Sequence, residues 1–412
     1  MLSSPKNCRI CRRPLQRTFI DLGVSPLANS YLRQAQLDRM EPFYPLHVFV
    51  CEGCLLVQLE EFESPENIFT DYAYFSSFST DWMAHARSFS EMAISRFGLT
   101  PVSNVVEIAS NDGYLLQYFL AKGMRVLGVE PAKNVAAAAV ERGVPTRTIF
   151  FGRETSSELF TEGHAADLLI GNNVFAHVPD LHSFVAGLAT LLKPEGVITL
   201  EFPHLLQLIL QNQFDTIYHE HYSYLSLLAV ERILGEHDLM VFDVEELPTH
   251  GGSLRVYGKH CRDGSKTVCP NVFEIRRKEH EAGLHAVERY ASFGDQATQV
   301  KCDLLRFLIE QKRANKTVAG YGAPAKGNTL LNYCGIGPEM LPYTVDRSPH
   351  KQGLFLPGTR IPIASPERIL ETRPDYVLIL PWNLRNEISS QMAAIRGWGG
   401  RFVVPIPNLE VF

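Results

Sequence analysis

The sequence lacks several features that would assign a protein to a class at once. Its 412 residues contain no apolar run approaching the roughly 20 residues of a membrane-spanning helix. Lys and Arg (39) are fewer than Asp and Glu (45), which gives a formal net charge of -6, whereas general nucleic-acid binders are usually basic. No tandem repeat or low-complexity tract is present. These absences predict a globular protein that binds neither membranes nor nucleic acids.

The N-terminal residues MLSSPKNCRICRRPL lack the apolar stretch of a secretory leader, which favours a cytoplasmic location. Disulfides are rare in that compartment, so clustered cysteines indicate metal binding. At roughly 150 residues per domain, the length predicts two or three domains. We expect three domains, at residues 1–65, 66–262 and 263–412, in a monomeric protein.

Two stretches alternate short β-branched runs with helical patterns, which is typical of parallel α/β sheets. In the first, strands are expected at Asn104–Ala109, Arg125–Glu130, Asp167–Gly171 and Val197–Phe202, followed by an antiparallel pair, Val241–Glu246 and Ser253–Gly258. A charged segment at Asn271–Lys316 reads as one or two connecting helices. In the second, strands are expected at Thr317–Tyr321, Tyr343–Val345, Tyr376–Leu380 and Arg401–Val404. We predict an α/β protein with two Rossmann-like domains and a small N-terminal module.

Four of the eight cysteines form two Cys-x-x-Cys pairs, Cys8 with Cys11 and Cys51 with Cys54. Two such pairs supply four thiolates, the closed tetrahedral set of a structural zinc site. A closed site has no open position for a substrate, so we expect this zinc to be structural. A redox pair is disfavoured because neither pair lies in a βαβ context. Four buried free thiols are the remaining alternative.

The segment Glu107–Gly113 (EIASNDG) joins a predicted strand to a predicted helix. An acidic residue, a tight loop and a helix N-terminus suit an adenosine-containing ligand, because such a loop presents backbone N–H donors. Glu130 ends the next strand, where a carboxylate can accept both hydroxyls of a ribose. Asn172 and Asn173 follow the third strand. Taken alone, the loop could also be an ordinary strand-to-helix turn.

In this order of elements the chain resembles the class I S-adenosylmethionine-dependent methyltransferases. That family's loop usually reads acidic-x-Gly-x-Gly-x-Gly. Here Ala109 and Asn111 stand at the first two glycine positions, and Gly113 is retained. Asn tolerates a left-handed backbone better than most residues, so the turn can survive.

The resemblance implies S-adenosylmethionine as the cofactor. Its expected binding residues are Glu107, Ala109, Asn111, Gly113, Glu130, Asn172 and Asn173. Tyr72 and Ser77 belong to a stretch rich in Tyr and Ser that precedes a predicted helix. We expect them to line the cofactor site as well, with packing under the zinc module as the alternative.

Residues 214–224 (FDTIYHEHYSY) contain two histidines, one glutamate and three tyrosines. His177 and His204 follow predicted strands, at the edge where the active sites of open α/β sheets gather. The HExxH pattern of zinc proteases fails because Ser223 stands at its second His position. A metal bound by the His-x-His pair remains an alternative, as does polar packing.

Residues 317–329 (TVAGYGAPAKGNT) again join a strand to a helix, and Asp346 ends the next strand. The helix N-terminus and Lys326 suit a pyrophosphate. The loop is not a P-loop, because Asn328 follows Gly327 where that motif has Lys. From these residues alone, the loop is either an NAD site or a structural turn with a solvated Lys.

Together, the two Cys pairs, YHEHYSY and GYGAPAKGNT resemble the deoxysugar C-methyltransferases over essentially the whole chain. Those enzymes methylate C-3 of nucleotide-linked 4-keto-6-deoxyhexoses. The resemblance implies that the C-terminal loop holds the thymidine diphosphate of the sugar substrate. The residues implied for this role are Tyr321, Gly322, Lys326, Asn328 and Thr329. The active site is then expected at the junction of the two Rossmann-like domains.

The chemistry fits these residues, because a carbon beside a ketone must lose a proton before it can attack a methyl group. Histidine supplies a base of near-neutral pKa. The resemblance implies His221 as the base, Tyr218 as the second choice, Glu220 as a tuning group and His177 as a contact to the sugar or the oxyanion. An O- or N-methyltransferase, an NAD-dependent oxidoreductase and a zinc adaptor without activity are the alternatives.

Overall fold

The computed structural model describes residues 6–64, 75–78 and 80–412, so the predicted cofactor residue Tyr72 lies outside the described residues. The chain forms two compact units, each assembled from three segments. Unit 1 comprises residues 1–15, 51–204 and 222–285; unit 2 comprises residues 16–50, 205–221 and 286–412. The two compact units therefore differ from the three continuous domains that we expected from the sequence. Those domain boundaries stay a prediction.

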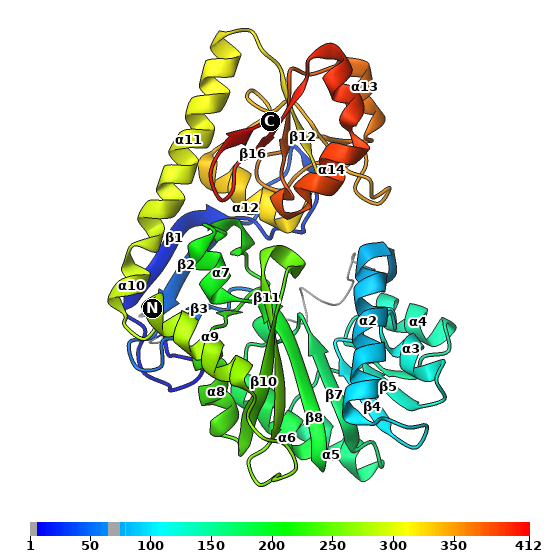
Figure 1. The fold of residues 1–412 in the computed structure, drawn as a ribbon. Helices are drawn as coiled ribbons and strands as arrows, with labels where there is room; N and C mark the ends of the chain where they lie inside the picture. Colours follow the sequence, from blue (N-terminus) through cyan, green and yellow to red (C-terminus); the bar gives the residue numbers. More distant parts are fainter. Residues whose placement is uncertain (1–5, 65–74, 79) are drawn as a thin grey trace. The chain divides into compact units, whose positions relative to one another are not determined.

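Unit 1 contains a seven-stranded sheet with the order β10-β11-β8-β7-β4-β5-β6 (Figure 1). Its strands are β4 (Asn104–Ile108), β5 (Arg125–Val129), β6 (Thr146–Arg147), β7 (Ala166–Asn172), β8 (Leu192–Pro203), β10 (Leu239–Leu247) and β11 (Ser253–His260). Strands β4 to β8 are mutually parallel, and β11 lies antiparallel between β8 and β10. The predicted strands and the antiparallel pair are confirmed.

Helices cover both faces of this sheet. They are α2 (Thr80–Phe97), α3 (Leu116–Leu120), α4 (Lys133–Glu141), α5 (Arg153–Thr161), α6 (Leu181–Leu191), α8 (Leu227–Gly235) and α9 (Pro270–Glu281). Successive residues of β4 face opposite sides: Val105 packs with α2 and α3, whereas Val106 packs with α5 and α6. A parallel strand that is buried on both faces is rich in apolar residues, and Val105, Val106 and Ile108 allowed β4 to be recognised from sequence.

Side-chain caps set the starts of two helices in unit 1. The carboxylate of Asp180 accepts a hydrogen bond from the N–H of Ser183 at the start of α6, and the hydroxyl of Ser226 accepts one from Ala229 at the start of α8. Such caps satisfy backbone donors that have no partner inside the helix. Elsewhere in unit 1, β3 (Val57–Leu59) pairs antiparallel with β9 (Ser223–Tyr224).

Unit 2 contains a six-stranded sheet with the order β14-β13-β12-β15-β16-β17, in which only β17 is antiparallel to its neighbour. Its strands are β12 (Val318–Tyr321), β13 (Thr344–Val345), β14 (Ile363–Ala364), β15 (Tyr376–Ile379), β16 (Arg401–Val404) and β17 (Glu410–Val411). Its helices are α7 (Leu205–Leu210), α10 (Glu288–Ala291), α11 (Phe293–Arg313), α12 (Ala325–Cys334), α13 (Glu367–Thr372) and α14 (Arg385–Gln391). The second Rossmann-like sheet is thus confirmed.

Two further features of the fold were not predicted in detail. Strands β1 (Arg17–Ser25) and β2 (Tyr44–Val50) form an antiparallel pair, and Phe19 of β1 stacks on Phe293 of α11 with ring centroids 4.7 Å apart. The segment expected as one or two connecting helices forms three, α9 to α11, and the boundary between the units falls after His285, between α9 and α10.

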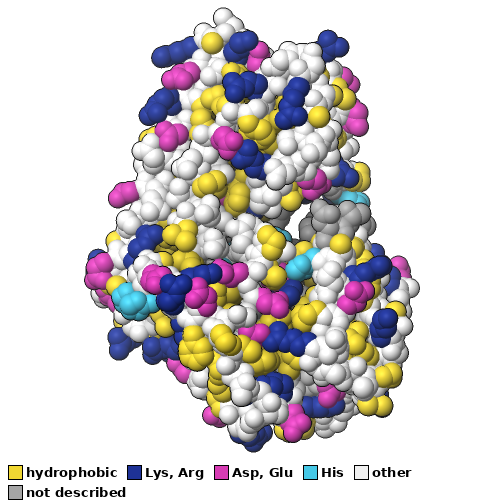
Figure 2. Space-filling model, viewed as in Figure 1, with side chains coloured by type: hydrophobic (Ala, Val, Ile, Leu, Met, Phe, Trp, Pro, Cys, Tyr) yellow, Lys and Arg dark blue, Asp and Glu magenta, His cyan; other side chains and the backbone are white. Residues whose placement is uncertain are grey.

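Among the described residues, no helix combines the length and apolar character needed to cross a bilayer. On the face that Figure 2 shows, basic side chains are interspersed with acidic ones. The absence of membrane and nucleic-acid partners stays a prediction.

Gly322 follows β12 with a φ of 93°, and a Cβ added there would lie 2.4 Å from Cδ of Pro381. We expect Gly322→Ala to lower the free energy of unfolding by about 3 kcal/mol, because backbone strain and overpacking add. Gly335→Ala is the matched control, since Gly335 has a φ of 69° but no atom within 4 Å of an added Cβ. It should cost about 1–2 kcal/mol. Equal losses in urea unfolding would contradict the packing argument.

Candidate functional site

The four cysteines of the two Cys-x-x-Cys pairs come together in unit 1, with their Sγ atoms all within 4.8 Å of one another. The Sγ atoms of Cys8 and Cys54 are 3.3 Å apart, as are those of Cys11 and Cys51. A tetrahedron with Zn–S bonds of about 2.3 Å has S–S edges of about 3.8 Å, so a small expansion accommodates zinc. The donor set therefore fits a closed structural zinc site.

The two cysteine turns have the same geometry. The N–H of Arg12 donates to the carbonyl of Cys8 at 3.0 Å, and the N–H of Leu55 donates to that of Cys51 at 2.8 Å. Arg12 and Leu55 both have a left-handed backbone, with φ near 60° (60° and 61°). The Gln58 amide also donates to Sγ of Cys8 at 3.3 Å. Such outer contacts orient thiolates toward a metal.

The predicted cofactor loop follows β4 and has a left-handed backbone at three positions. The φ angles are 55° at Ala109, 49° at Asn111 and 74° at Gly113. These are the positions at which the resembling family has glycine. A left-handed Ala costs about 1–2 kcal/mol, so surrounding contacts must hold this turn. The expectation that Asn111 keeps the turn intact is confirmed for its backbone.

Glu130, directly after β5, supplies part of this support. Its carboxylate oxygens accept hydrogen bonds from the N–H groups of Asn111 and Ala132, both at 2.9 Å. Burial raises its pKa, against the effect of these two bonds. A carboxylate has about four acceptor positions, so two remain for the hydroxyls of a ribose.

Glu107 is completely buried in β4, and neither of its carboxylate oxygens has a hydrogen-bond partner among the described residues. Burial raises its pKa well above the ordinary value, opposed by the neighbouring Tyr114. Oγ of Ser110 and Oδ1 of Asn172, at neighbouring strand ends, are also buried without a partner in the described part of the chain. Unsatisfied buried polar atoms require an explanation, and a polar ligand at these strand ends supplies one.

The remaining side of the loop is held by an ion pair between the buried Asp112 and the exposed Arg142. The carboxylate of Asp112 accepts from the hydroxyl of Ser77 at 2.5 Å and lies 2.8 Å from the guanidinium of Arg142. Arg142 also donates to the Ser77 hydroxyl at 2.8 Å. The structure thus places Ser77 against the loop, in contact with Asp112 and Arg142.

His177 and Asn173 lie beyond the carboxyl end of β7. Asn173 has a φ of 52°, and its N–H donates to the carbonyl of Glu201 at 2.7 Å. His177 ends the short helix η3 (Phe175–His177) and is half-buried. His204 differs from expectation: its Nε2 lies 2.8 Å from Glu279, whose carboxylate also accepts from the N–H of Leu227 at the start of α8. His204 therefore has a packing role here.

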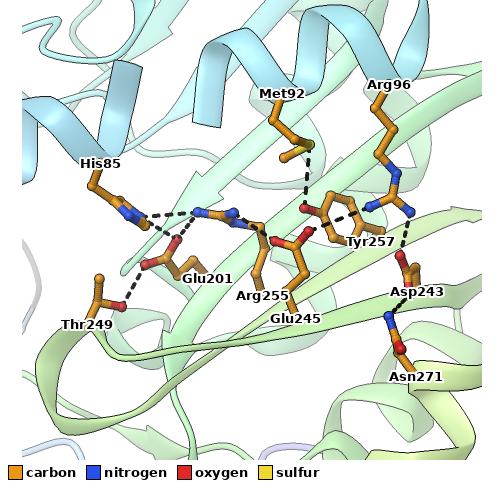
Figure 3. Close-up of polar contacts among 10 residues, drawn as sticks. All are labelled: His85, Met92, Arg96, Glu201, Asp243, Glu245, Thr249, Arg255, Tyr257 and Asn271. Carbon is orange, nitrogen blue, oxygen red and sulfur yellow. Dashed lines mark hydrogen bonds and ion pairs between the residues drawn. The ribbon is translucent and has the colours of Figure 1, made fainter. Parts of the chain in front are cut away.

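A chain of charged side chains runs along α2, β8, β10 and β11 (Figure 3). Glu201 is fully buried and lies 2.7 Å from Arg255 and 3.1 Å from His85. These partners lower its pKa to about 2, led by His85 and Arg255, although burial acts in the opposite direction. Arg255 continues to Glu245 at 3.0 Å, and Arg96 pairs with Asp243. Sequence reasoning missed this network because its members are far apart in the chain.

In unit 2, the imidazole of His221 is held in one tautomer. Its Nδ1 lies 2.9 Å from the carbonyl oxygen of Thr216, which can only accept, so Nδ1 carries the proton. Nε2 of the neutral ring then has a lone pair and can act as a base. The ring of Tyr218 lies 4.1 Å from that of His221 at an angle of 34°. The two residues predicted as base and alternative base are therefore neighbours.

The other two members of the segment have different surroundings. Glu220 is buried and accepts a hydrogen bond from the Asn29 amide at 2.6 Å; burial raises its pKa to about 7. His219 lies 3.2 Å from the carbonyl of Pro45, and burial lowers its pKa. Among the described residues, the four cysteines are the only group of three or more His, Cys, Asp or Glu side chains that could hold a metal ion. The alternative of a metal bound by the His-x-His pair therefore has no support.

Lys326 contacts residues that the sequence did not indicate. Its Nζ donates to the amide oxygen of Asn383 at 2.9 Å and lies 4.8 Å from the centre of the Trp382 ring. The indole N–H of Trp382 donates to the carboxylate of Asp215 at 2.7 Å. Burial raises the pKa of Asp215 to about 6, and the charge of Lys326 opposes this rise. A cation and a buried carboxylate thus both contact Trp382, near the start of α12.

The other predicted substrate residues divide into two groups. Asn328 and Thr329 are buried and donate to the backbone carbonyls of Ala28 and Ile217, at 2.6 and 2.9 Å. Tyr321 borders a hollow of about 590 Å³, together with Arg347, Gln352, Ser365, Glu367 and Gln391. This hollow lies at the carboxyl end of β12, the edge at which open α/β sheets bind ligands.

Comparisons with known proteins decide the family. "C-methyltransferase NovU" from Streptomyces niveus is 38% identical over 404 residues, which cover 98% of this chain and 96% of that protein. The chain belongs to this C-methyltransferase family. Three family models agree: "Putative zinc binding domain" matches residues 8–69, "Methyltransferase domain" residues 83–244 and "C-methyltransferase C-terminal domain" residues 248–407. The enzyme class and the zinc-binding module predicted from the sequence are thereby confirmed.

Two further similarities cover only part of the C-methyltransferase chain. A ubiquinone biosynthesis O-methyltransferase from Rhodopseudomonas palustris is 26% identical over 96 residues, 23% of this chain and 38% of that protein. The magnesium protoporphyrin IX methyltransferase of Synechocystis PCC 6803, solved with bound SAM, is 15% identical with a TM-score of 0.34. It covers 47% of this chain and 88% of its own.

Replacing a zinc ligand tests the metal assignment. We expect Cys51→Ser to abolish bound zinc, measured by elemental analysis, and to lower the unfolding midpoint by roughly 10 °C, because metal binding contributes folding free energy. Cys261→Ser is the matched control, since Cys261 is an exposed free thiol of the same unit. Full zinc content in Cys51→Ser would contradict the assignment.

The raised pKa of Glu220 predicts a pH-dependent stability. Its ordinary value is 4.5 and its value in the folded protein about 7, so the folded state binds the proton more tightly. The Glu220 contribution is therefore lost as the pH rises from 4.5 through 7. The Glu220→Gln variant has no group that titrates at this position. Its free energy of unfolding, minus that of the wild type, should therefore increase by ~3 kcal/mol between pH 4 and pH 8. Urea unfolding measures this difference. The exposed Glu371→Gln should show no such trend.

Proposed function

We propose that this C-methyltransferase transfers the methyl group of S-adenosylmethionine to C-3 of a thymidine-diphosphate-linked 4-keto-6-deoxyhexose. The family assignment supports transfer to carbon. The resemblance of YHEHYSY and GYGAPAKGNT to the deoxysugar enzymes supports a nucleotide-linked keto-sugar as the acceptor. The binding partner of the enzyme is then this small molecule. That the protein is a monomer and lies in the cytoplasm stays a prediction.

The strand ends of unit 1 would hold the cofactor. The left-handed loop at residues 109–113 presents backbone N–H groups, and the acceptor positions left on Glu130 suit the ribose hydroxyls. The unsatisfied Glu107 carboxylate and Asn172 amide oxygen suit polar groups of the same ligand. When bound, S-adenosylmethionine supplies an electrophilic methyl group, and the protein holds it in line with the attacking carbon.

The observation that carries the proposal is the fixed tautomer of His221. The hydrogen bond from Nδ1 to the Thr216 carbonyl leaves Nε2 able to accept the proton from C-3. Glu220, with a pKa raised to about 7, is partly protonated at neutral pH and can donate a hydrogen bond. His177, in unit 1, is our candidate for a contact to the sugar or to the enolate oxygen.

The loop after β12 in unit 2 would hold the nucleotide diphosphate. The Lys326 cation at the start of α12 suits a phosphate, and the hollow beside Tyr321 suits the rest of the nucleotide. The side chains of Asn328 and Thr329 donate hydrogen bonds to backbone carbonyls. Their contribution is to fix α12, on which Lys326 stands.

The test combines product analysis with a variant. The enzyme, supplied with S-adenosylmethionine and the keto-sugar, should yield a sugar methylated at C-3, identified by nuclear magnetic resonance. We expect His221→Asn to lower kcat by about 10²–10⁴-fold, because general base catalysis contributes that much. His350→Asn, an exposed histidine of the same unit, is the control. Near-normal turnover of His221→Asn would exclude His221 as the base.

A further inference from the structure

Arg9 stands in the first cysteine turn, but its guanidinium contacts backbone far outside that turn. Its Nη1 donates to the carbonyl oxygen of Leu59 at 2.6 Å and to that of Tyr222 at 3.4 Å. Its Nε donates to the carbonyl oxygen of Pro179 at 3.1 Å. All four residues belong to unit 1. One side chain therefore joins the cysteine turn to three segments that are far apart in the sequence.

Two of these segments adjoin predicted active-site residues. Pro179 comes two residues after His177, and Tyr222 directly follows His221. The backbone of Tyr222 also joins the two segments, because its N–H donates to the carbonyl oxygen of Ala176 at 2.8 Å. The boundary between unit 2 and unit 1 runs between His221 and Tyr222. The guanidinium therefore holds the chain where the YHEHYSY segment enters unit 1.

The contact between Arg9 and Tyr222 is well enclosed. Tyr222 is fully buried, and Cζ of Arg9 lies 5.3 Å from the centroid of its ring. The N–H of Leu59 donates to the same Tyr222 carbonyl at 3.0 Å, next to the pairing of β3 with β9. Arginine suits such a junction, because its planar guanidinium has five N–H donors in a fixed geometry and also packs on aromatic rings.

The zinc-binding turn fixes Arg9 from the other side. The N–H of Arg9 donates to the amide oxygen of Gln58 at 2.9 Å, and the amide nitrogen of Gln58 donates to Sγ of Cys8 at 3.3 Å. When bound, zinc supplies folding free energy to this turn. Contacts of this kind orient the residues around a metal site, so the turn in turn orders the Arg9 side chain.

We propose that Arg9 is a positioning residue for the methyl transfer. Its guanidinium joins the zinc-binding turn to Pro179 and Tyr222, and so fixes the backbone next to both predicted active-site histidines. The proposal rests on the proposed function, because it takes His221 as the base and His177 as the acceptor contact. Arg9 acts through these two segments and takes no part in proton or methyl transfer itself.

The experiment compares two substitutions of Arg9 with a matched control. Arg9→Met keeps an apolar stem of similar length and removes every donor, whereas Arg9→Lys keeps the charge but not the planar fork. Arg232→Met is the control, because Arg232 of α8 donates to the carbonyl oxygen of Gly53 in the second cysteine turn at 3.3 Å. It removes a guanidinium contact to the zinc-binding module and leaves the contacts of Arg9 in place.

We expect Arg9→Met to lower kcat by about 10²-fold, because a displacement of about 1 Å at a reacting group costs that much even when the mutation is remote. Zinc content, the Kd of S-adenosylhomocysteine and the KM for S-adenosylmethionine should stay at wild-type values. Arg9→Lys should recover part of kcat, to about tenfold below the wild type. Arg232→Met should keep the wild-type kcat. All assays are run well below the unfolding midpoint of each variant.

Wild-type kcat in Arg9→Met would overturn the inference while the proposed function stands. If Arg9→Met does not fold, the milder Arg9→Lys decides in the same way. Loss of zinc or of S-adenosylhomocysteine binding in Arg9→Lys would assign Arg9 to the fold alone and overturn the inference, as would an equal fall of kcat in Arg232→Met. A wild-type enzyme that leaves C-3 of the keto-sugar unmethylated would overturn the proposed function, and the inference with it.

Discussion

Burying a carboxylate costs free energy unless its surroundings compensate for it, and this constraint shapes the ligand edge of unit 1. Three buried carboxylates lie in or directly after strands β8, β4 and β5 of one sheet, and each is compensated differently. Glu201 is paired with Arg255 and His85, and Glu130 accepts two backbone N–H groups. Glu107 has no hydrogen-bond partner in the described chain. Glu201 holds the turn at Thr249, Glu130 holds the loop at Asn111, and Glu107 is our proposed contact to the polar groups of the cofactor.

In unit 2, the same cost of burial brings the pKa values of two carboxyl groups close to neutral pH. Burial raises the pKa of Asp215 to about 6 and that of Glu220 to about 7. His221 stands next to Glu220, with its tautomer set by a backbone carbonyl. Groups whose pKa lies close to the working pH transfer protons most effectively, which suits removal of a proton from carbon. The cysteine cluster suits a closed structural zinc site, because four thiolates complete a tetrahedral coordination sphere.

Local patterns predicted the fold well. Buried runs such as residues 104–108 mark parallel strands, and the spacing of the four cysteines predicted their cluster. The two-residue strands β14 and β17 were missed, whereas the equally short β13 was found within the expected strand Tyr343–Val345. The site was predicted less completely, since the contacts of Asn29 with Glu220 and of Trp382 with Asp215 join residues far apart in sequence. The contacts of Arg9 with Pro179 and Tyr222 could not be predicted for the same reason.

Solvent exchange at the acceptor carbon tests the central claim most directly. The enzyme, the keto-sugar and S-adenosylhomocysteine are incubated in deuterium oxide, where methyl transfer is impossible but deprotonation is not. The account predicts that the wild type incorporates deuterium at C-3 and that His221→Asn does so at a rate lower by about 10²-fold or more. A wild-type enzyme that methylates the sugar but never exchanges the C-3 proton would contradict it.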